Sequence, residues 1–240
     1  MNDFVDALKF IGDNPGLLAG RAAAQLAIAG AAIGIAMAVA LPIGVWLGHL
    51  HRGSFIAINI SNVGRALPSL AVVAINIALL GLGVINLIVA LVILAVPPML
   101  TNAYTAVDGV DREVVDAARG MGMRSFEVLG RVELPLAIPL LFAGVRTASV
   151  YVVATVTLGA VTGTDGGLGD IIANQASYRL AGVLGAAICV AALALLVEGI
   201  LAGLQWAVTP HGLRTKAPDV VAFDDAYRAA PSVPTAGAMP

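Results

Sequence analysis

The chain of 240 residues is far more apolar than a soluble domain, with 59% hydrophobic and 12% charged side chains and a mean hydropathy of +0.94. Soluble domains carry about 25% charged residues, and a core of this size could not bury so many apolar side chains. The net charge of −2 gives no support to a nucleic-acid partner, and the lone Cys189 excludes an internal disulfide. We therefore expect an all-α integral membrane protein.

We expect the first 20 residues to form a short segment at the membrane interface. They are acidic and are interrupted at Asn14 and Pro15, whereas a cleavable signal peptide begins with basic residues and continues directly into an apolar stretch. An additional span over residues 4–20 is the alternative. Asp13 and the two residues after it disfavour that span, because charged, polar and helix-breaking groups are costly in lipid.

Five apolar segments are long enough to cross a bilayer as helices, because a span requires about 20 residues. Within a transmembrane domain of residues 21–207, we place them at residues 22–48, 54–80, 84–106, 134–158 and 180–206. The second and third segments divide at Gly81–Asn86, where two glycines and an asparagine permit a tight turn. Pro68 and the Pro97–Pro98 pair predict bends within them, since proline removes a helical hydrogen bond.

The segment between the third and fourth spans, residues 107–133, is the most highly charged part of the chain, with ten Asp, Glu and Arg side chains. We call it the charged segment. Asp111 is a suitable N-cap for a short helix over residues 111–119, and Gly120–Gly122 should end that helix. We expect a second helix over Ser125–Glu133. The charges should keep this part of the chain in water.

The distribution of Lys and Arg predicts the orientation of the spans, because these residues favour cytoplasmic loops. With five spans, the charged segment and residues 208–240 lie on a side that carries eight Lys and Arg, against three on the other side. This places the C-terminus in the cytoplasm and the N-terminus outside. Residues 208–240 are rich in Pro and Ala, which predicts a disordered cytoplasmic tail.

The stretch DAARGMGMRSFEVLGRVELP, residues 116–135, resembles the cytoplasmic loop signature of ABC-importer permeases. That signature reads Glu-Ala-Ala, three residues, Gly, nine residues, an aliphatic residue, any residue and Leu-Pro. Every spacing matches, and the one departure, Asp116 for Glu, keeps the carboxylate. The resemblance implies a type I ABC-importer transmembrane domain in a bacterial cell membrane, with a coupling helix that docks on a cytosolic ATPase subunit. The residues that it assigns to this coupling are Asp116, Ala117, Ala118, Arg119, Gly122, Leu134 and Pro135.

Three further stretches resemble permeases for quaternary-amine osmoprotectants, namely glycine betaine, carnitine, choline and proline. They are residues 64–83, 97–111 and 143–170. Permeases that import methionine share the signature and the stretch Gly166–Gly169 but match elsewhere less well, so methionine or another amino acid is the alternative substrate. Asp165 departs from the pattern, because a small residue is more usual before these glycines.

The resemblance also implies partners and a division of labour. The partners are a cytosolic ATPase subunit, a second permease subunit that is identical or similar, an extracytoplasmic substrate-binding protein and the lipid bilayer. The sequence has no GxxxxGK[ST] phosphate loop, so we expect ATP on the partner subunit and no cofactor on this chain. No nucleophile–base pair or metal-ligand spacing stands out, so neither an enzyme nor a metal site is expected. A stand-alone secondary transporter or channel is the alternative from another class; it predicts internal repeats, which the sequence lacks.

Polar side chains inside the spans are candidates for a translocation pathway or gate. They are Asn59, Asn62, Arg65 and Tyr151. A charge at mid-depth costs about 2.5–3.5 kcal/mol, so Arg65 should face other helices or pair with carbonyls freed by Pro68. Tyr151 could offer an aromatic face to a quaternary ammonium group. Arg146 is expected to reach the cytoplasmic interface, and Glu198 to pair structurally within the last span.

Overall fold

The computed structural model describes residues 2–51, 55, 59, 62, 64, 66–163 and 167–210, which form helices joined by short turns and contain no strand. The longest helices are α2 (Pro15–His49), α5 (Val84–Asp108), α8 (Leu134–Thr155) and α10 (Gln175–Val208). The shorter helices are α1 (Asn2–Asp13), α4 (Ser69–Leu80), α6 (Arg112–Gly120), α7 (Ser125–Val128) and α9 (Gly169–Ala173). A π-helical turn, η1 (Leu129–Glu133), joins α7 to α8, and a 3-10 helix, η2 (Val156–Thr162), extends α8.

Four of the described helical stretches are long and apolar enough to cross a membrane. They are α2, α5, α10 and the continuous stretch Ser125–Thr162, which contains α8. The prediction of an all-α membrane protein is therefore confirmed. Helix α4 forms the second half of the expected span over residues 54–80, and most of its first half lies outside the described residues.

The prolines affect the helices in two different ways. Pro68 directly precedes α4 as its N-cap residue, so the chain leaves the helical conformation there. Pro97 and Pro98 lie inside α5. The side chains of Thr101 and Asn102 donate hydrogen bonds to the carbonyl oxygens of these two prolines, at 2.9 and 2.8 Å. These bonds orient two polar side chains on one face of α5.

The N-terminal helix α1 ends at Asp13, and α2 begins with Pro15 in its first turn, where proline is tolerated. The interruption expected from the sequence therefore separates the two helices. Helix α1 packs across the start of α10, where the rings of Phe10 and Tyr178 meet edge to face at a centroid separation of 6.3 Å. Its interfacial position stays a prediction.

Small residues let α2 approach its neighbours closely. Its buried positions include Ala32, Ala36, Ala40, Gly44 and Gly48, which recur every four residues on one face. A Cβ atom on Gly48 would lie 2.8 Å from the carbonyl oxygen of Tyr104 and 2.9 Å from Cβ of Val107. Such spacing is typical of helices that pack backbone against backbone in membranes. The C-terminal end of α2 is thereby held directly on α5.

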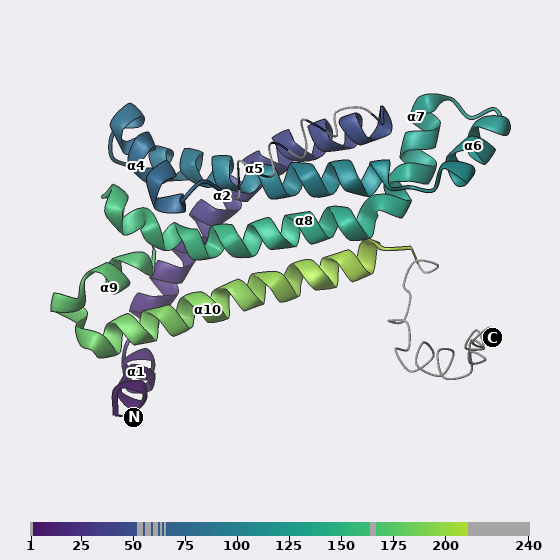
Figure 1. The fold of residues 1–240 in the computed structure, drawn as a ribbon. Helices are drawn as coiled ribbons and strands as arrows, with labels where there is room; N and C mark the ends of the chain where they lie inside the picture. The colour runs from purple at the N-terminus through teal and green to yellow at the C-terminus, as the bar shows by residue number, and fades with distance from the viewer. Residues whose placement is uncertain are drawn as a thin grey trace, which may run out of the picture.

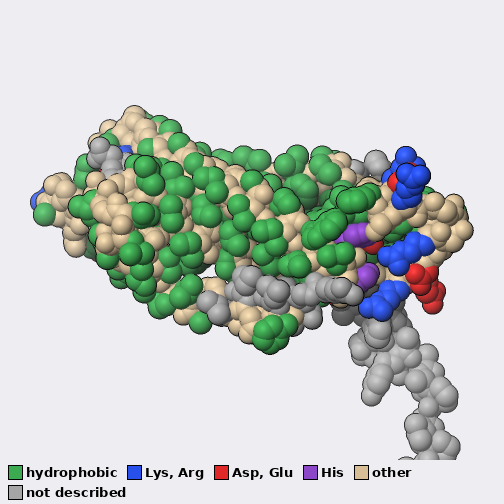
Figure 2. Space-filling model, turned by 90° about the horizontal axis from the view of Figure 1, so that it is seen from above, with side chains coloured by type: hydrophobic (Ala, Val, Ile, Leu, Met, Phe, Trp, Pro, Cys, Tyr) green, Lys and Arg blue, Asp and Glu red, His purple; other side chains and the backbone are tan. Residues whose placement is uncertain are grey.

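The two ends of the molecule differ in composition. Helices α6 and α7 project at the end where α10 finishes, and α1 and α9 lie at the opposite end (Figure 1). Apolar side chains cover the length of the molecule between these ends, whereas Lys, Arg, Asp and Glu gather over the projecting end (Figure 2). Large apolar side chains on α4 and α10 are exposed, among them Leu79, Leu195 and Ile200. This distribution fits helices whose flanks lie in lipid.

Candidate functional site

Helix α6 has the start and the end that the sequence predicts. The Asp111 carboxylate accepts a hydrogen bond from the backbone N–H of Glu113 at 2.9 Å, which satisfies one of the unpaired donors at the helix start. Val115 and Ala118 are buried in a small apolar cluster beneath the helix. Gly122 follows with φ of +86°, a conformation that favours glycine, and it turns the chain toward α7.

The outer face of α6 is exposed and weakly paired within the chain. Nη1 of Arg119 lies 3.9 Å from Oδ1 of Asp116, and these side chains are 50% and 75% exposed. Ala117 and Gly122 are also exposed, whereas Ala118 faces inward and is buried. Four of the residues assigned to ATPase coupling thus form a surface, while Leu134 and Pro135 lie half-buried at the start of α8.

The base of the charged segment contains a buried polar contact. Nδ1 of His49, near the end of α2, lies 2.6 Å from Oε2 of Glu133, and its Nε2 lies 2.7 Å from Oγ of Ser125. With Nδ1–H of the ring donating to the Glu133 carboxylate, the matching neutral tautomer leaves Nε2 to accept the Ser125 hydroxyl proton. The side chains of His49 and Glu133 are 4% and 0% exposed. This contact joins α2 to α7 and η1.

The π-helical turn explains why Glu133 is buried. In an α-helix, position 132 would follow the buried Val128 on the same face, but the backbone N–H of Leu134 bonds five residues back to Leu129. The wider turn rotates Glu133 onto the face of Val128 and of the buried Ala137. A charged residue is therefore directed inward at the junction with α8.

A cavity of about 460 Å³ lies between α5 and α8, beside the residue Gly64. Its described walls are Gly64, Leu67, Leu94, Pro97, Pro98, Thr101, Asn102, Thr147 and Tyr151. These residues supply hydroxyl, amide and aromatic groups and carry no formal charge. Tyr151 is 41% exposed. The cavity is within the size range of small-molecule sites, roughly 300–1,000 Å³.

Only one of the candidate pathway residues lines this cavity among the residues that the structure describes. It is Tyr151. Asn59 and Asn62 are exposed, and Nδ2 of Asn59 donates to the carbonyl oxygen of Phe55 at 2.7 Å. Arg65 and the unusual Asp165 lie outside the described residues. The role of Asn59 and Asn62 stays a prediction.

The chain was compared with known families and structures. Residues 30–208 match the family model of the binding-protein-dependent transport system inner membrane component. The chain belongs to this family. It is thus the permease subunit of an ABC importer and a multi-pass membrane protein, as the cytoplasmic loop signature predicts.

Relatives of this permease include several osmoprotectant permeases. It is 37% identical to the glycine betaine/carnitine/choline transport system permease protein OpuCB of Bacillus subtilis, over 86% of this chain and 95% of the relative. Identity to the carnitine transport permease protein OpuCB of Listeria monocytogenes is 39%, over 79% and 87%. OpuCD of the same Bacillus subtilis system is 33% identical, over 72% and 76%.

The fold also matches a solved structure. A chain of the MetNI methionine ABC transporter, in an inward-facing conformation, superposes with a TM-score of 0.68 at 22% sequence identity. The match covers 81% of this permease and 97% of the other chain. The architecture is therefore that of a type I ABC-importer transmembrane domain, as predicted.

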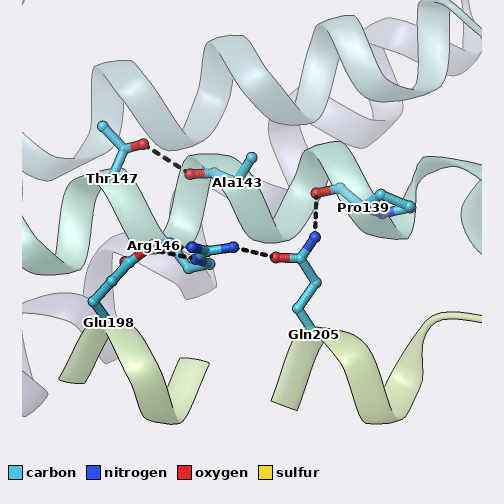
Figure 3. A network of polar contacts seen from close by, with 6 residues as sticks. All are labelled: Pro139, Ala143, Arg146, Thr147, Glu198 and Gln205. Atoms are coloured by element: carbon cyan, nitrogen blue, oxygen red, sulfur yellow. Dashed lines mark hydrogen bonds and ion pairs between the residues drawn. The ribbon is translucent and has the colours of Figure 1, made fainter. Parts of the chain in front are cut away.

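Arg146 of the permease pairs with side chains of α10, and its expected reach to the cytoplasmic interface stays a prediction. Its Nε donates to Oε1 of Glu198 at 2.9 Å, and Nη2 contacts the same oxygen. Its Nη1 donates to Oε1 of Gln205 at 2.8 Å, and Nε2 of Gln205 donates to the carbonyl oxygen of Pro139 (Figure 3). Arg146 therefore bridges α8 and α10 and neutralises Glu198. The expectation that Glu198 pairs structurally is confirmed.

Sequence reasoning missed the polar contact at the base of the charged segment. Ser125 and Glu133 are expected from the sequence in a short helix that stays in water, and no local pattern singles out His49. A signal was present, because Glu133 lies one helical turn before the apolar Ala137, at the start of the fourth span. Its partner is 84 residues away in the chain, and no local pattern names it.

Among the described residues, no group of three or more His, Cys, Asp and Glu side chains could hold a metal ion.

Proposed function

We propose that this permease forms, with a second permease subunit, the pathway by which a quaternary-amine osmoprotectant crosses the bacterial cell membrane. The observation that carries the substrate class is the cavity whose described walls, Tyr151 and polar side chains of α5 and α8 among them, carry no formal charge. A quaternary ammonium group has no N–H to donate in a hydrogen bond. It is attracted instead by aromatic faces and by the negative ends of oxygen dipoles. The relatives named for glycine betaine, carnitine and choline support the same class.

The energy comes from a separate cytosolic ATPase subunit, which binds the charged segment. The exposed face with Asp116 and Arg119 supports this, because its long ion pair leaves both charges able to meet a partner. ATP binds to that subunit, and the permease itself is not an enzyme. The charged end lies in the cytoplasm, with the N-terminus outside, where a substrate-binding protein delivers the solute.

The second permease subunit is either another copy of this chain or a similar protein. One Bacillus subtilis system carries two different relatives of the chain, OpuCB and OpuCD, under the same system name. A similar rather than identical partner is thus as well supported as a homodimer.

The test is uptake of labelled glycine betaine in a strain that lacks its own osmoprotectant transporters. The strain carries the permease with its ATPase and binding protein, at low and at high salt, and the control has an ATPase whose ATP-site lysine is replaced. We expect uptake only with the active ATPase. Methionine uptake in place of betaine uptake would change the substrate, and uptake without the ATPase would favour a stand-alone transporter.

Substitutions of Tyr151 test the cavity. Tyr151→Phe keeps the aromatic face and should retain uptake, whereas Tyr151→Ala should lower it about 3- to 30-fold, the range of one cation–π contact. Equal uptake by the two variants would remove Tyr151 from the pathway.

A further inference from the structure

The charged segment is attached to the spans by contacts that do not follow the chain. Ser125, at the start of α7, and Glu133, at the end of η1, contact the same ring of His49 on α2. Trp46, one turn before His49, stacks on Phe126 with a centroid separation of 5.8 Å and an interplanar angle of 28°. Hydrogen bonds and an aromatic stack therefore join one end of α2 to the first turn of α7.

These contacts add a polar connection between two elements that also meet in an apolar cluster, which contains Val45 of α2, Leu129 of η1 and Ala137 of α8. Helix α7, η1 and α8 form one continuous helical stretch, so movement of the charged segment passes directly into α8. The end of α2 instead packs on α5 through Gly44 and Gly48. The ring of His49 thus supplies the polar contacts at the junction where the base of α8 and the end of α2 meet.

Burial makes this meeting point resistant to separation. His49 and Glu133 are both shielded from solvent, and Oε1 of Glu133 is buried without a hydrogen-bond partner among the residues that the structure describes. A hydrogen bond is stronger in such surroundings than in water, and a separated carboxylate would be left buried and unpaired. The two elements should therefore move together.

We propose that His49, Ser125 and Glu133 are positioning residues that form a latch, through which movement of the charged segment carries the end of α2 with it. The proposal rests on the proposed function, because closure of the ATPase supplies the movement. Helix α2 then moves α5 through their close packing, and α5 forms one wall of the cavity. With the latch broken, α8 moves without α2, and ATP is hydrolysed without complete opening of the cavity.

The first test measures betaine transported per ATP hydrolysed, with the complete importer in liposomes. Ser125→Ala removes the hydroxyl that contacts His49, and Ser125→Thr retains a hydroxyl. Ser177→Ala is the matched control, since Ser177 is an exposed serine in the first turn of α10, at the other end of the molecule. We expect the ratio to fall about five- to tenfold in Ser125→Ala, as for one lost hydrogen bond, with ATP hydrolysis retained. The other two variants should match the unaltered importer.

An unchanged ratio in Ser125→Ala would overturn the latch. A fall in Ser177→Ala as large as that in Ser125→Ala would overturn it as well, because the effect would then not be specific to the contact with His49. If the unaltered importer shows no ATP-dependent uptake, the proposed function fails instead, and the two failures are therefore distinguishable.

The second test does not depend on the substrate. The exposed Ile43 on α2 and Leu140 on α8 are each replaced by Cys and spin-labelled. Cys189 is changed to Ala so that it does not take up the label. The separation of the two labels is measured before and after the ATPase is trapped closed with vanadate. The separation should stay constant in the latched protein and change by more than about 2 Å, the scale of helix shifts, in Ser125→Ala and in His49→Asn. Asn keeps a donor near the position of Nδ1 for Glu133 but cannot reach Ser125. A constant separation in both variants would overturn the latch.

Discussion

The outer face of the charged segment and its base use charge in opposite ways. On the outer face, Asp116 and Arg119 are exposed and 3.9 Å apart. At the base, His49 and Glu133 are buried and 2.6 Å apart. An exposed pair contributes little to stability and is free to exchange its partner, whereas a buried pair is costly to break. The outer face is therefore suited to binding a partner, whereas the base is suited to transmitting movement between helices.

The largest expected effect is at the base. His49→Leu leaves the Glu133 carboxylate buried without its partner, and we expect the free energy of unfolding to fall by about 3–5 kcal/mol. The matched control is His51→Leu, because His51 pairs with Asp108 at 2.9 Å where both side chains are partly exposed. That change should cost less than about 1 kcal/mol. Equilibrium unfolding in mixed micelles measures both variants. Equal losses of unfolding free energy would contradict the distinction between the buried pair and the exposed one.

The next effect concerns the ion pair inside the spans. Arg146→Leu leaves Glu198 unpaired between α8 and α10, with an expected loss of about 2–3 kcal/mol in the same unfolding measurement. The double variant, with Glu198→Leu added, should lose less than the sum of the two single variants. Strictly additive losses would show that the two residues are not coupled.

Close packing of α2 on α5 gives a smaller effect. Gly48→Ala places a Cβ against the backbone of Tyr104 and should cost about 1–3 kcal/mol of unfolding free energy. Gly34→Ala is the control on the same helix, because no atom lies within 4 Å of the added Cβ. It should be neutral or slightly stabilising, by up to about 1 kcal/mol. A similar cost at both positions would argue against close approach of the helices at Gly48.

The smallest effect on stability is expected on the outer face. Arg119→Glu should change the unfolding free energy by no more than about 0.5 kcal/mol. Uptake and binding of the ATPase should nevertheless both fall, because the variant reverses a charge on the proposed docking surface. Lys9→Glu, also exposed but on α1, serves as the control and should leave uptake unchanged. Normal uptake by Arg119→Glu would contradict the docking role.

Local signals predicted the helical elements of the charged segment. The cap at Asp111 and the turn at Gly122 depend on residues within one helical turn of each other, so the sequence contains the whole cause. The cavity is different, since Tyr151 lines it while Asn59 and Asn62 do not. All three are polar residues in apolar stretches, and composition cannot tell which way each helix face turns.

The sequence by itself determined that the chain lies in a membrane, where its apolar helices run and which segment carries the signature of an ABC-importer permease. Hydropathy, capping and motif spacing all act between residues near one another in the chain. Only the tertiary structure decided that Arg146 pairs with Glu198 and that His49 meets Glu133, across 52 and 84 positions. Such pairs depend on the rotation and register of packed helices, in which one π-helical turn is enough to direct a carboxylate inward.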